Sequence, residues 1–254
     1  MHSPYQPGII DPDMLLLGYR GGIFPMADAR DDPEIFWVEP RWRAILPLDG
    51  FHLSRSLAKI LRRGTFEVTC DGAFAEVLDH CAAPRRDTAD TWISQRIAAT
   101  YRTMHTRGWA HSVECWRDGK LVGGLYGVGF DRVFCGESMF SLEPDASKVA
   151  LAWLVAAMRR GGYELLDCQF MTGHLASLGA VEISQNEYQL RLADAQRAAI
   201  GTGEGAVFGA GEGVGDGLAL PLPEAFAALV GDAAAAGSSS SPGNFIAQSL
   251  TQTS

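Results

Sequence analysis

Three polar side chains, those of Glu137, Asp167 and Gln169, lie in segments that are otherwise apolar. Asp167 and Gln169 belong to the run YELLDCQF, whose alternation predicts a β-strand with both polar side chains on one face and Cys168 with its apolar neighbours on the other. Residues two apart on a strand stand about 6.5–7 Å apart, so both side chains could act on one small reacting group. A carboxylate and an amide in an apolar strand cost free energy unless they are paired, so this strand predicts a functional site. The alternative is a structural pair that bonds loop backbone.

A helix must connect this strand to the one that carries Glu137. Apolar side chains recur between residues 151 and 158 at the spacing of one helical face, which predicts an amphipathic helix. Asp145 or Ser147 can cap its start, and the glycine pair at 161–162 can end it. The segment 135–180 is therefore predicted to fold as strand, helix and strand.

The rest of the chain supplies more helices and an antiparallel meander. Helical patterns cover residues 51–64, 73–82, 91–108 and 183–200, and residues 14–26 read as a short helix that is broken by the glycine pair at 21–22 and closed by Pro25. Residues 35–48 read as two short strands split by a proline, and 65–70 as one strand. Strand-like runs at 111–118, 120–128 and 131–140 are separated by turn residues. This order predicts an α+β fold with a mostly antiparallel sheet, and it matches the acetyltransferase-like (GNAT-like) fold.

Three regions are expected along the chain: a small N-terminal α+β domain at residues 1–50, a GNAT-like catalytic domain at 51–200 and a flexible low-complexity tail at 201–254. The tail is rich in Gly, Ala and Ser, which predicts disorder and no part in the core. Residues 218–230 form one apolar stretch within it that could make a short helix.

The composition limits the class of protein. The chain has 254 residues, 47% of them hydrophobic, enough for one large core or two smaller ones. It has no long apolar run and no signal-peptide pattern, so a cytoplasmic, non-membrane protein is expected. A net charge of −9 argues against a general nucleic-acid binder but permits a local basic patch. The five cysteines form no CxxC pair, which predicts reduced thiols and no metal site.

Several motifs occur together in one order: GYRGGIFPM, PRWRAILP, HLSRSL, CAAPRRDTADTWI, CGESMFS, LLDCQ and HLASLGA. In this combination the chain resembles the leucyl/phenylalanyl-tRNA–protein transferase family from about residue 11 to residue 192. The resemblance implies transfer of Leu or Phe from aminoacyl-tRNA to proteins that begin with Arg or Lys, which marks those proteins for degradation. It implies no metal or nucleotide cofactor, and a monomer is expected.

The resemblance also implies roles for the polar residues. Asp167 and Gln169 would be catalytic: Asp167 would polarise the side-chain amide of Gln169, which would accept a hydrogen bond from the attacking amine and orient it. Glu137, with Gln169, would bind the acceptor, since a desolvated carboxylate selects a cationic Arg or Lys side chain. The alternative for Glu137 is a carboxylate at the solvent-exposed rim.

Substrate contacts are expected elsewhere. Leu125, Phe134 and Leu154 are candidates for an apolar amino-acid pocket, although each is equally plausible as core. By the resemblance, Trp92 would stack on the terminal adenosine of tRNA, and Met26 stands where relatives carry a second aromatic.

Five arginines could contact phosphates of the tRNA acceptor arm, and the equally weighted alternative for each is a solvated, partly paired surface residue: Arg85, Arg86, Arg55, Arg62 and Arg63. We further expect His174 to bond backbone and Cys168 to face away from the site, which argues against a covalent thiol mechanism.

Two rival functions use the same features. A coenzyme A-dependent N-acyltransferase would share the fold, but the pyrophosphate-binding turn of that fold is glycine-rich, and the matching stretch SLEPDASKVAL contains no glycine. A non-enzymatic module that binds N-terminal Arg or Lys and delivers proteins to a protease would need the acceptor site alone. Transfer of a labelled aminoacyl group distinguishes the enzyme from the module.

Overall fold

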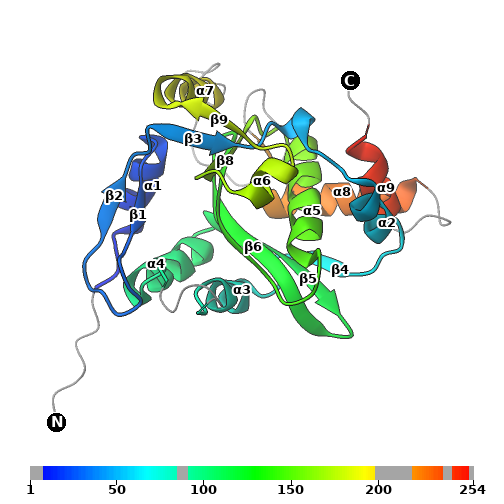
Figure 1. Cartoon of the computed structure of the whole chain (residues 1–254), viewed down its shortest axis with the longest axis horizontal. Coiled ribbons are helices and arrows are strands. Elements are labelled where there is room, and N and C mark those ends of the chain that lie inside the picture. Colours follow the sequence, from blue (N-terminus) through cyan, green and yellow to red (C-terminus); the bar gives the residue numbers. More distant parts are fainter. Residues whose placement is uncertain (1–7, 85–90, 198–218, 237–241, 252–254) are drawn as a thin grey trace, which may run out of the picture.

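A seven-stranded sheet organises the molecule (Figure 1). The computed structural model describes residues 8–84, 91–197, 219–236 and 242–251. In sheet order the strands are β4 (Glu67–Cys70), β5 (Ala110–Arg117), β6 (Lys120–Phe130), β7 (Val133–Ser141), β8 (Leu165–Gln169), β3 (Trp42–Ile45) and β9 (Val181–Ser184). Only β7 and β8 pair in parallel, and every other neighbouring pair is antiparallel. The predicted α+β class, the mostly antiparallel sheet and the meander β5–β6–β7 are confirmed.

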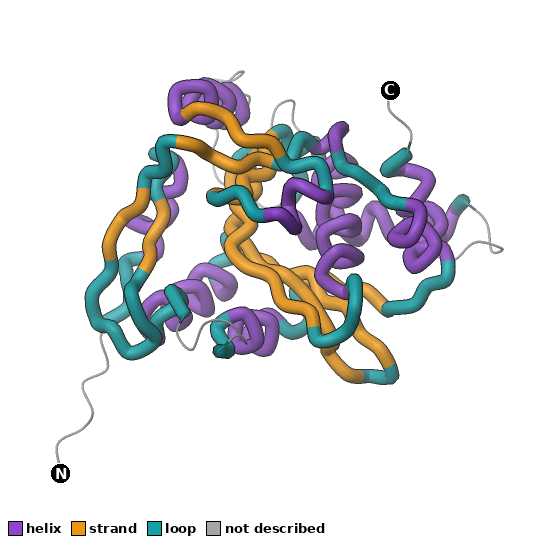
Figure 2. Tube along the Cα trace, in the orientation of Figure 1, coloured by secondary structure: helices purple, strands orange, loops and turns teal. Residues whose placement is uncertain are grey.

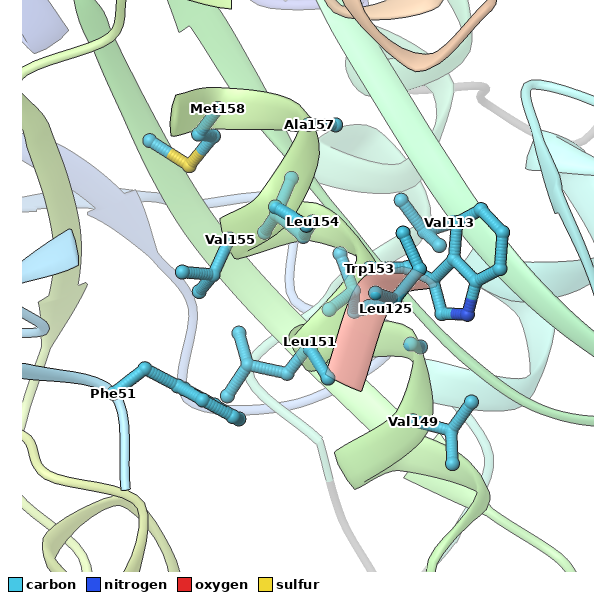
Figure 3. Close-up of a cluster of buried hydrophobic side chains, with 14 of the residues drawn as sticks. Phe51, Val113, Leu125, Val149, Leu151, Trp153, Leu154, Val155, Ala157 and Met158 are labelled. Carbon is cyan, nitrogen blue, oxygen red and sulfur yellow. The ribbon is translucent and has the colours of Figure 1, made fainter. Parts of the chain in front are cut away.

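Alternation along the strands divides the interior into two cores, one on each face of the sheet. Phe134 on β7 points into the first core, whereas Val133 and Cys135 point into the second. The first core packs against α5 (Ala146–Gly161), the helix that joins the parallel strands, and against α2 (Arg55–Arg62). Figure 3 shows its apolar side chains gathered around α5.

The helices of the second core cover the other face of the sheet: α1 (Pro12–Arg20), α3 (Phe74–Cys81), α4 (Gln95–Thr106) and α7 (Gln185–Arg197). Figure 2 shows helices on both sides of the orange strands. Among the described residues, no helix is both long and apolar enough to cross a membrane.

Local signals place several helix ends as predicted. Ser54 caps α2 by accepting a hydrogen bond from the Leu57 N–H. Gly162 ends α5 with φ +79°, a left-handed conformation that glycine adopts without steric cost. Asp145 precedes α5 as expected, but its side chain makes no capping bond because the residue is itself left-handed, with φ +67°.

Two predicted helices each prove to be a helix plus a strand. The segment 14–26 is α1 followed, after the glycine pair, by β1 (Phe24–Met26), which pairs with β2 (Phe36–Val38) in a separate two-stranded sheet. The segment 183–200 overlaps the end of β9 before α7 begins. In the first case the helix ends at the glycine pair, as predicted, and Pro25 then favours an extended strand instead of only closing the helix.

The expectation that residues 201–254 add nothing to the core is wrong for 219–236 and 242–251, while 201–218 lie outside the described residues. Two helices, α8 (Leu222–Ala235) and α9 (Pro242–Ser249), pack beside α5 and α2 (Figure 1). Phe226 stacks on Trp153 with ring centroids 5.3 Å apart, and Ile246 is fully buried. The possible short helix at 218–230 is confirmed as part of α8, whereas its packing against the core was not predicted.

The limits of the domains stay a proposal. Strand β3 precedes residue 50, yet it is hydrogen-bonded on both sides within the seven-stranded sheet, to β8 and to β9. We therefore propose that the N-terminal unit ends near residue 41 rather than at residue 50, and that the catalytic unit begins with β3.

Candidate active site

The parallel strands β7 and β8 separate part-way along their length, and a cavity opens where they do. Their pairing runs only from Val133 opposite Leu165 to Cys135 opposite Asp167. Just beyond it lies a cavity of about 380 Å³. The residues that line it are Trp92, Leu125, Tyr126, Gly136, Glu137, Ser138, Met139, Leu151, Leu154, Leu166, Cys168, Gln169, Phe170, Thr172, His174 and Leu175.

A β-bulge explains how Glu137 comes to face this cavity. On β6, Tyr126 lies opposite Ser138 and Gly127 lies opposite Gly136, which leaves Glu137 as the extra residue of β7. A bulge interrupts the ladder and re-aims a side chain. The carboxylate of Glu137 is only 9% exposed and accepts hydrogen bonds from Gln169 Nε2 at 2.9 Å and from Tyr101 Oη at 2.9 Å.

The environment of Glu137 shifts its pKa so that its protonation state changes with pH near neutrality. Burial raises the pKa of Glu137 to about 7, although the hydroxyls of Tyr19 and Tyr101 oppose the rise. The two tyrosine hydroxyls lie 2.5 Å apart, which joins α1 and α4 to the carboxylate. Among the described residues, Glu137 is the one carboxylate that lines the cavity, and no Lys or Arg lines it.

Asp167 lies behind the cavity wall and not in the cavity. Its carboxylate is fully buried and forms two hydrogen bonds with the guanidinium of Arg43, from Nε at 2.9 Å and from Nη2 at 2.5 Å. It also accepts from Tyr188 Oη at 3.0 Å. The sequence reading missed Arg43 and Tyr188, which lie on β3 and α7.

The expected contact between Asp167 and the Gln169 side-chain amide is wrong. Asp167 Oδ1 accepts from the backbone N–H of Gln169 at 2.9 Å, while the side chain of Gln169 turns to Glu137. The prediction that Asp167 and Gln169 share a face fails because Gln169 has φ +56°, which breaks the alternation at the end of β8. Gln169 therefore lines the cavity together with Cys168, so the expectation that Cys168 faces away is also wrong.

The family of the chain follows from comparison with known proteins. The profile described as "Leucyl/phenylalanyl-tRNA protein transferase" matches residues 45–193, and the profile of its N-terminal domain matches residues 8–41. The chain belongs to this family. The resemblance seen in the motifs is confirmed, and the protein is an enzyme that transfers an aminoacyl group from tRNA to a protein.

Curated relatives carry the same description. The leucyl/phenylalanyl-tRNA–protein transferase of Novosphingobium aromaticivorans is 62% identical over 99% of this chain and 100% of that protein. The one of Rhizorhabdus wittichii is 60% identical over 70% of this chain and 72% of its own length. Among solved structures, L-PGS from Bacillus licheniformis matches with 14% identity and a TM-score of 0.36, over 67% of this chain and 56% of that one.

The apolar wall of the transferase cavity contains two of the three predicted pocket residues. Leu125 on β6 and Leu154 on α5 both line the cavity, and Figure 3 shows them close to Leu151. Phe134 does not line it: the ring is fully buried in the first core, because it precedes the point where β7 leaves β8. Met139, directly opposite Leu125 in the register, was missed, although the predicted meander makes it a cross-strand neighbour.

The residues predicted to contact tRNA lie in different parts of the transferase. Trp92 lines the cavity. Met26 lies on β1, packs against the second core and does not line the cavity. Arg85 and Arg86 lie outside the described residues. The other three arginines, Arg55, Arg62 and Arg63, are exposed on and just after α2.

Two further polar groups line the cavity without partners in the described structure. His174 Nε2 is buried and makes no hydrogen bond, so the expectation that this histidine bonds backbone is wrong for that nitrogen. Burial and the charge of Lys148 lower the pKa of His174, which favours the neutral form of its ring. The hydroxyl of Tyr126 is likewise buried without a partner.

The remaining chemistry of the cavity is limited. Burial raises the pKa of the Cys168 thiol, which disfavours the thiolate that a covalent mechanism needs. Within the described ranges, no group of three His, Cys, Asp or Glu side chains is arranged to hold a metal ion. The groups left for the reaction are the apolar wall, the carboxyl group of Glu137, whose pKa is about 7, and the side-chain amide of Gln169, which Glu137 orients.

Proposed function

We propose that this transferase moves Leu or Phe from aminoacyl-tRNA to the N-terminal Arg or Lys of acceptor proteins, and that the added residue marks them for degradation. The observation that carries the proposal is the buried carboxylate of Glu137, which among the described residues is the one carboxylate that lines the cavity and has no Lys or Arg beside it there. A buried carboxylate is stabilised by a cationic partner, and the side chain of an N-terminal Arg or Lys supplies one.

The donor amino acid fits the apolar part of the cavity. Leu125, Leu154, Met139 and Leu151 present aliphatic and thioether side chains without charge. An apolar pocket accepts Leu or Phe and rejects charged side chains, which would lose their hydration there. The names of the curated relatives give Leu and Phe as the amino acids of their tRNA substrates.

The reaction needs positioning more than strong base catalysis. The acceptor's α-amino nitrogen attacks the ester carbonyl, a C–N bond forms, the ester C–O bond breaks, and the tRNA ribose oxygen leaves with a proton. Gln169 donates from Nε2 to Glu137, so its Oε1 is directed away from that carboxylate and can accept from the attacking amine. An amide is a weak base, and the ester is already activated, so orientation is the main contribution. Asp167 acts through the backbone of Gln169.

The proposal is tested by incubating the purified protein with radiolabelled Leu-tRNA and a peptide that begins with Arg. Transfer of label to the peptide is expected, with little transfer to the same peptide beginning with Asp. Binding of the peptide without transfer would instead support a recognition module that delivers proteins to a protease. We further propose that the enzyme works as a cytoplasmic monomer, which sedimentation with and without tRNA would test.

Trp92 provides a test of the donor side. If its ring stacks on a base of the tRNA 3′ end, Trp92→Ala is expected to raise the KM for Leu-tRNA about 5- to 150-fold, the equivalent of ~1–3 kcal/mol of stacking. Trp92→Phe should lose much less, because stacking requires a ring and not the indole N–H. Steady-state kinetics with Leu-tRNA varied would measure both variants. Equal losses in the two would contradict stacking.

A further inference from the structure

The ion pair of Arg43 and Asp167 is the most deeply buried charged pair in the part of the chain that the structure describes. The two side chains are 1% and 0% exposed. Neither lines the cavity, so neither is placed to touch a substrate there. Burying two charges costs several kcal/mol per ion before their attraction is counted, so such a pair is weak evidence for a stabilising role.

Every acceptor position of the Asp167 carboxylate is occupied. Oδ1 accepts from Arg43 Nε and from the backbone N–H of Gln169, both at 2.9 Å. Oδ2 accepts from Arg43 Nη2 at 2.5 Å and from Tyr188 Oη at 3.0 Å. A carboxylate offers about four lone-pair sites, so Asp167 has none left to take a proton from an attacking amine.

One of these four bonds holds a strained residue. Gln169 has φ +56°, a left-handed conformation that costs a non-glycine residue about 1–2 kcal/mol. The bond from its N–H to Asp167 Oδ1 compensates part of that cost. The turned backbone is also what directs the Gln169 side chain to Glu137 in the cavity.

Arg43 is itself fixed from three further directions. Its Nη1 donates to the carbonyl of Gly22 at 3.1 Å, in the segment that leads into β1. Its guanidinium carbon lies 4.8 Å from the ring centroid of Phe24 and 4.3 Å from that of Tyr188. A planar guanidinium can make these contacts and a bidentate carboxylate pair together, which a lysine ammonium cannot.

We propose that Arg43 and Tyr188 are positioning residues for aminoacyl transfer. Their hydrogen bonds hold the carboxylate of Asp167 in place, and that carboxylate in turn fixes the backbone N–H of Gln169. The side-chain amide of Gln169 is thereby directed at Glu137 and at the incoming amine. The inference rests on the proposed function of the cavity. It assigns Asp167 no proton transfer, and it gives β3 and α7 a part in the reaction although neither strand nor helix reaches the substrate.

The test uses the full chain, Leu-tRNA at saturation and a varied Arg-initiated peptide. Arg43→Lys keeps the charge but loses the bidentate pair, so kcat/KM for the peptide should fall about 10- to 100-fold, as expected for a misplaced reacting group. Tyr188→Phe keeps the ring against Arg43 and removes one bond to Asp167, with an expected loss of about tenfold. The KM for Leu-tRNA should not change in either variant. The control, Arg20→Lys, alters the exposed ion pair between Arg20 and Asp131 and should keep native kinetics.

Two readouts separate positioning from a merely structural role. Arg43→Lys combined with Asp167→Asn should lose no more activity than the worse single variant, because both act through the same backbone bond. Asp167→Asn should keep the pH dependence of the native enzyme while lowering the rate. Three results would each overturn the inference. The first is a double variant whose loss of activity is the sum of the two single losses. The second is native kinetics in both Arg43→Lys and Tyr188→Phe, and the third is a limb of the pH profile that is missing in Asp167→Asn. If Arg43→Lys does not fold, Tyr188→Phe decides alone. A native enzyme that transfers nothing would instead refute the proposed function.

Discussion

Glu137→Gln is expected to raise the KM for an Arg-initiated peptide about 30- to 700-fold, since losing one partner of a partly desolvated charge pair costs roughly 2–4 kcal/mol. The glutamine keeps the size of the side chain: its Oε1 can still accept from Gln169 Nε2, and its Nε2 can donate to Tyr101 Oη in place of the bond that the carboxylate accepted, so the cavity should stay intact. The KM for Leu-tRNA should hardly change. Steady-state transfer with each substrate varied in turn measures both constants.

The same variant should alter the pH dependence of the reaction. With its pKa raised to about 7 by burial, Glu137 is mostly protonated at pH 6 and mostly ionised at pH 8. The native kcat/KM for the basic acceptor should therefore rise through pH 7 as the carboxylate acquires its charge. Glu137→Gln should lose that limb and keep the one that belongs to the acceptor's own amine, which ionises near pH 8.

Stability should change in the opposite direction to activity. The pKa of Glu137 is higher in the folded state, about 7, than its ordinary value of 4.5, so the folded protein binds the extra proton between these limits. The stability that this group contributes is fully present below pH 4.5 and is lost as pH rises through 7, in total about 3 kcal/mol. Glu137→Gln should therefore unfold at a higher temperature than the native protein at pH 8, and at a similar temperature near pH 4.

A matched control is Glu182→Gln, which removes the same charge from an exposed position on β9. It should change neither the acceptor KM nor the melting temperature at pH 8. A Glu137→Gln enzyme with native acceptor kinetics would remove Glu137 from the acceptor site and leave the carboxylate a structural role.

Five of the residues that line the cavity could be named from the sequence. Glu137, Gln169, Leu125, Leu154 and Trp92 are far apart in sequence, and all five line one cavity. A lone polar residue in an apolar segment costs free energy, and that cost is visible without a structure.

Backbone details set the limit of prediction. Strict alternation placed Asp167 beside Gln169, but one residue with positive φ turned the second side chain to the other face. Nothing in the run YELLDCQF signals that turn. Arg43 could have been found by the rule that singled out Asp167, because it is a lone charge in the apolar run WRAIL and a buried charge requires a partner.

The C-terminal segment shows how composition can mislead. Its glycines, alanines and serines predict disorder, yet Leu222, Phe226 and Leu229 recur at the spacing of one helical face and are buried against the first core. A rule based on average content does not detect three well-spaced apolar residues.

Removal of residues 198–254 is therefore expected to destabilise the enzyme severely rather than to leave it unchanged. The deletion uncovers the side of α5 that packs against α8, including Trp153, which is only 5% exposed in the intact chain. The deletion also removes five large apolar side chains whose burial stabilises the intact chain: Leu222, Phe226, Leu229, Ile246 and Leu250. Each contributes about 1.5–3 kcal/mol, and the sum rivals the whole stability of a typical domain, about 5–15 kcal/mol. The truncated protein should be insoluble or melt far below the full chain.

Point variants resolve the same prediction without a deletion. Phe226→Ala should cost about 3–5 kcal/mol of unfolding free energy, since it leaves a cavity against Trp153. Val230→Ala on the same helix is the control; this side chain is 38% exposed, and the cost should stay within about 0.5 kcal/mol.

Helix α8 lies close to α5 at Gly161. Gly161→Ala should therefore lower the stability of the protein if α8 packs on α5, and raise it if α8 does not. At Gly161 an added Cβ would lie 2.7 Å from the Cβ of Ala225, and the Gly161 carbonyl accepts from Leu220 N at 2.9 Å. In a free helix Gly→Ala stabilises by about 1 kcal/mol. Because the two helices touch here, Gly161→Ala should lower the midpoint of chemical denaturation. A higher midpoint in Gly161→Ala, together with a Phe226→Ala variant as stable as the native protein, would show that α8 does not pack on α5 in solution.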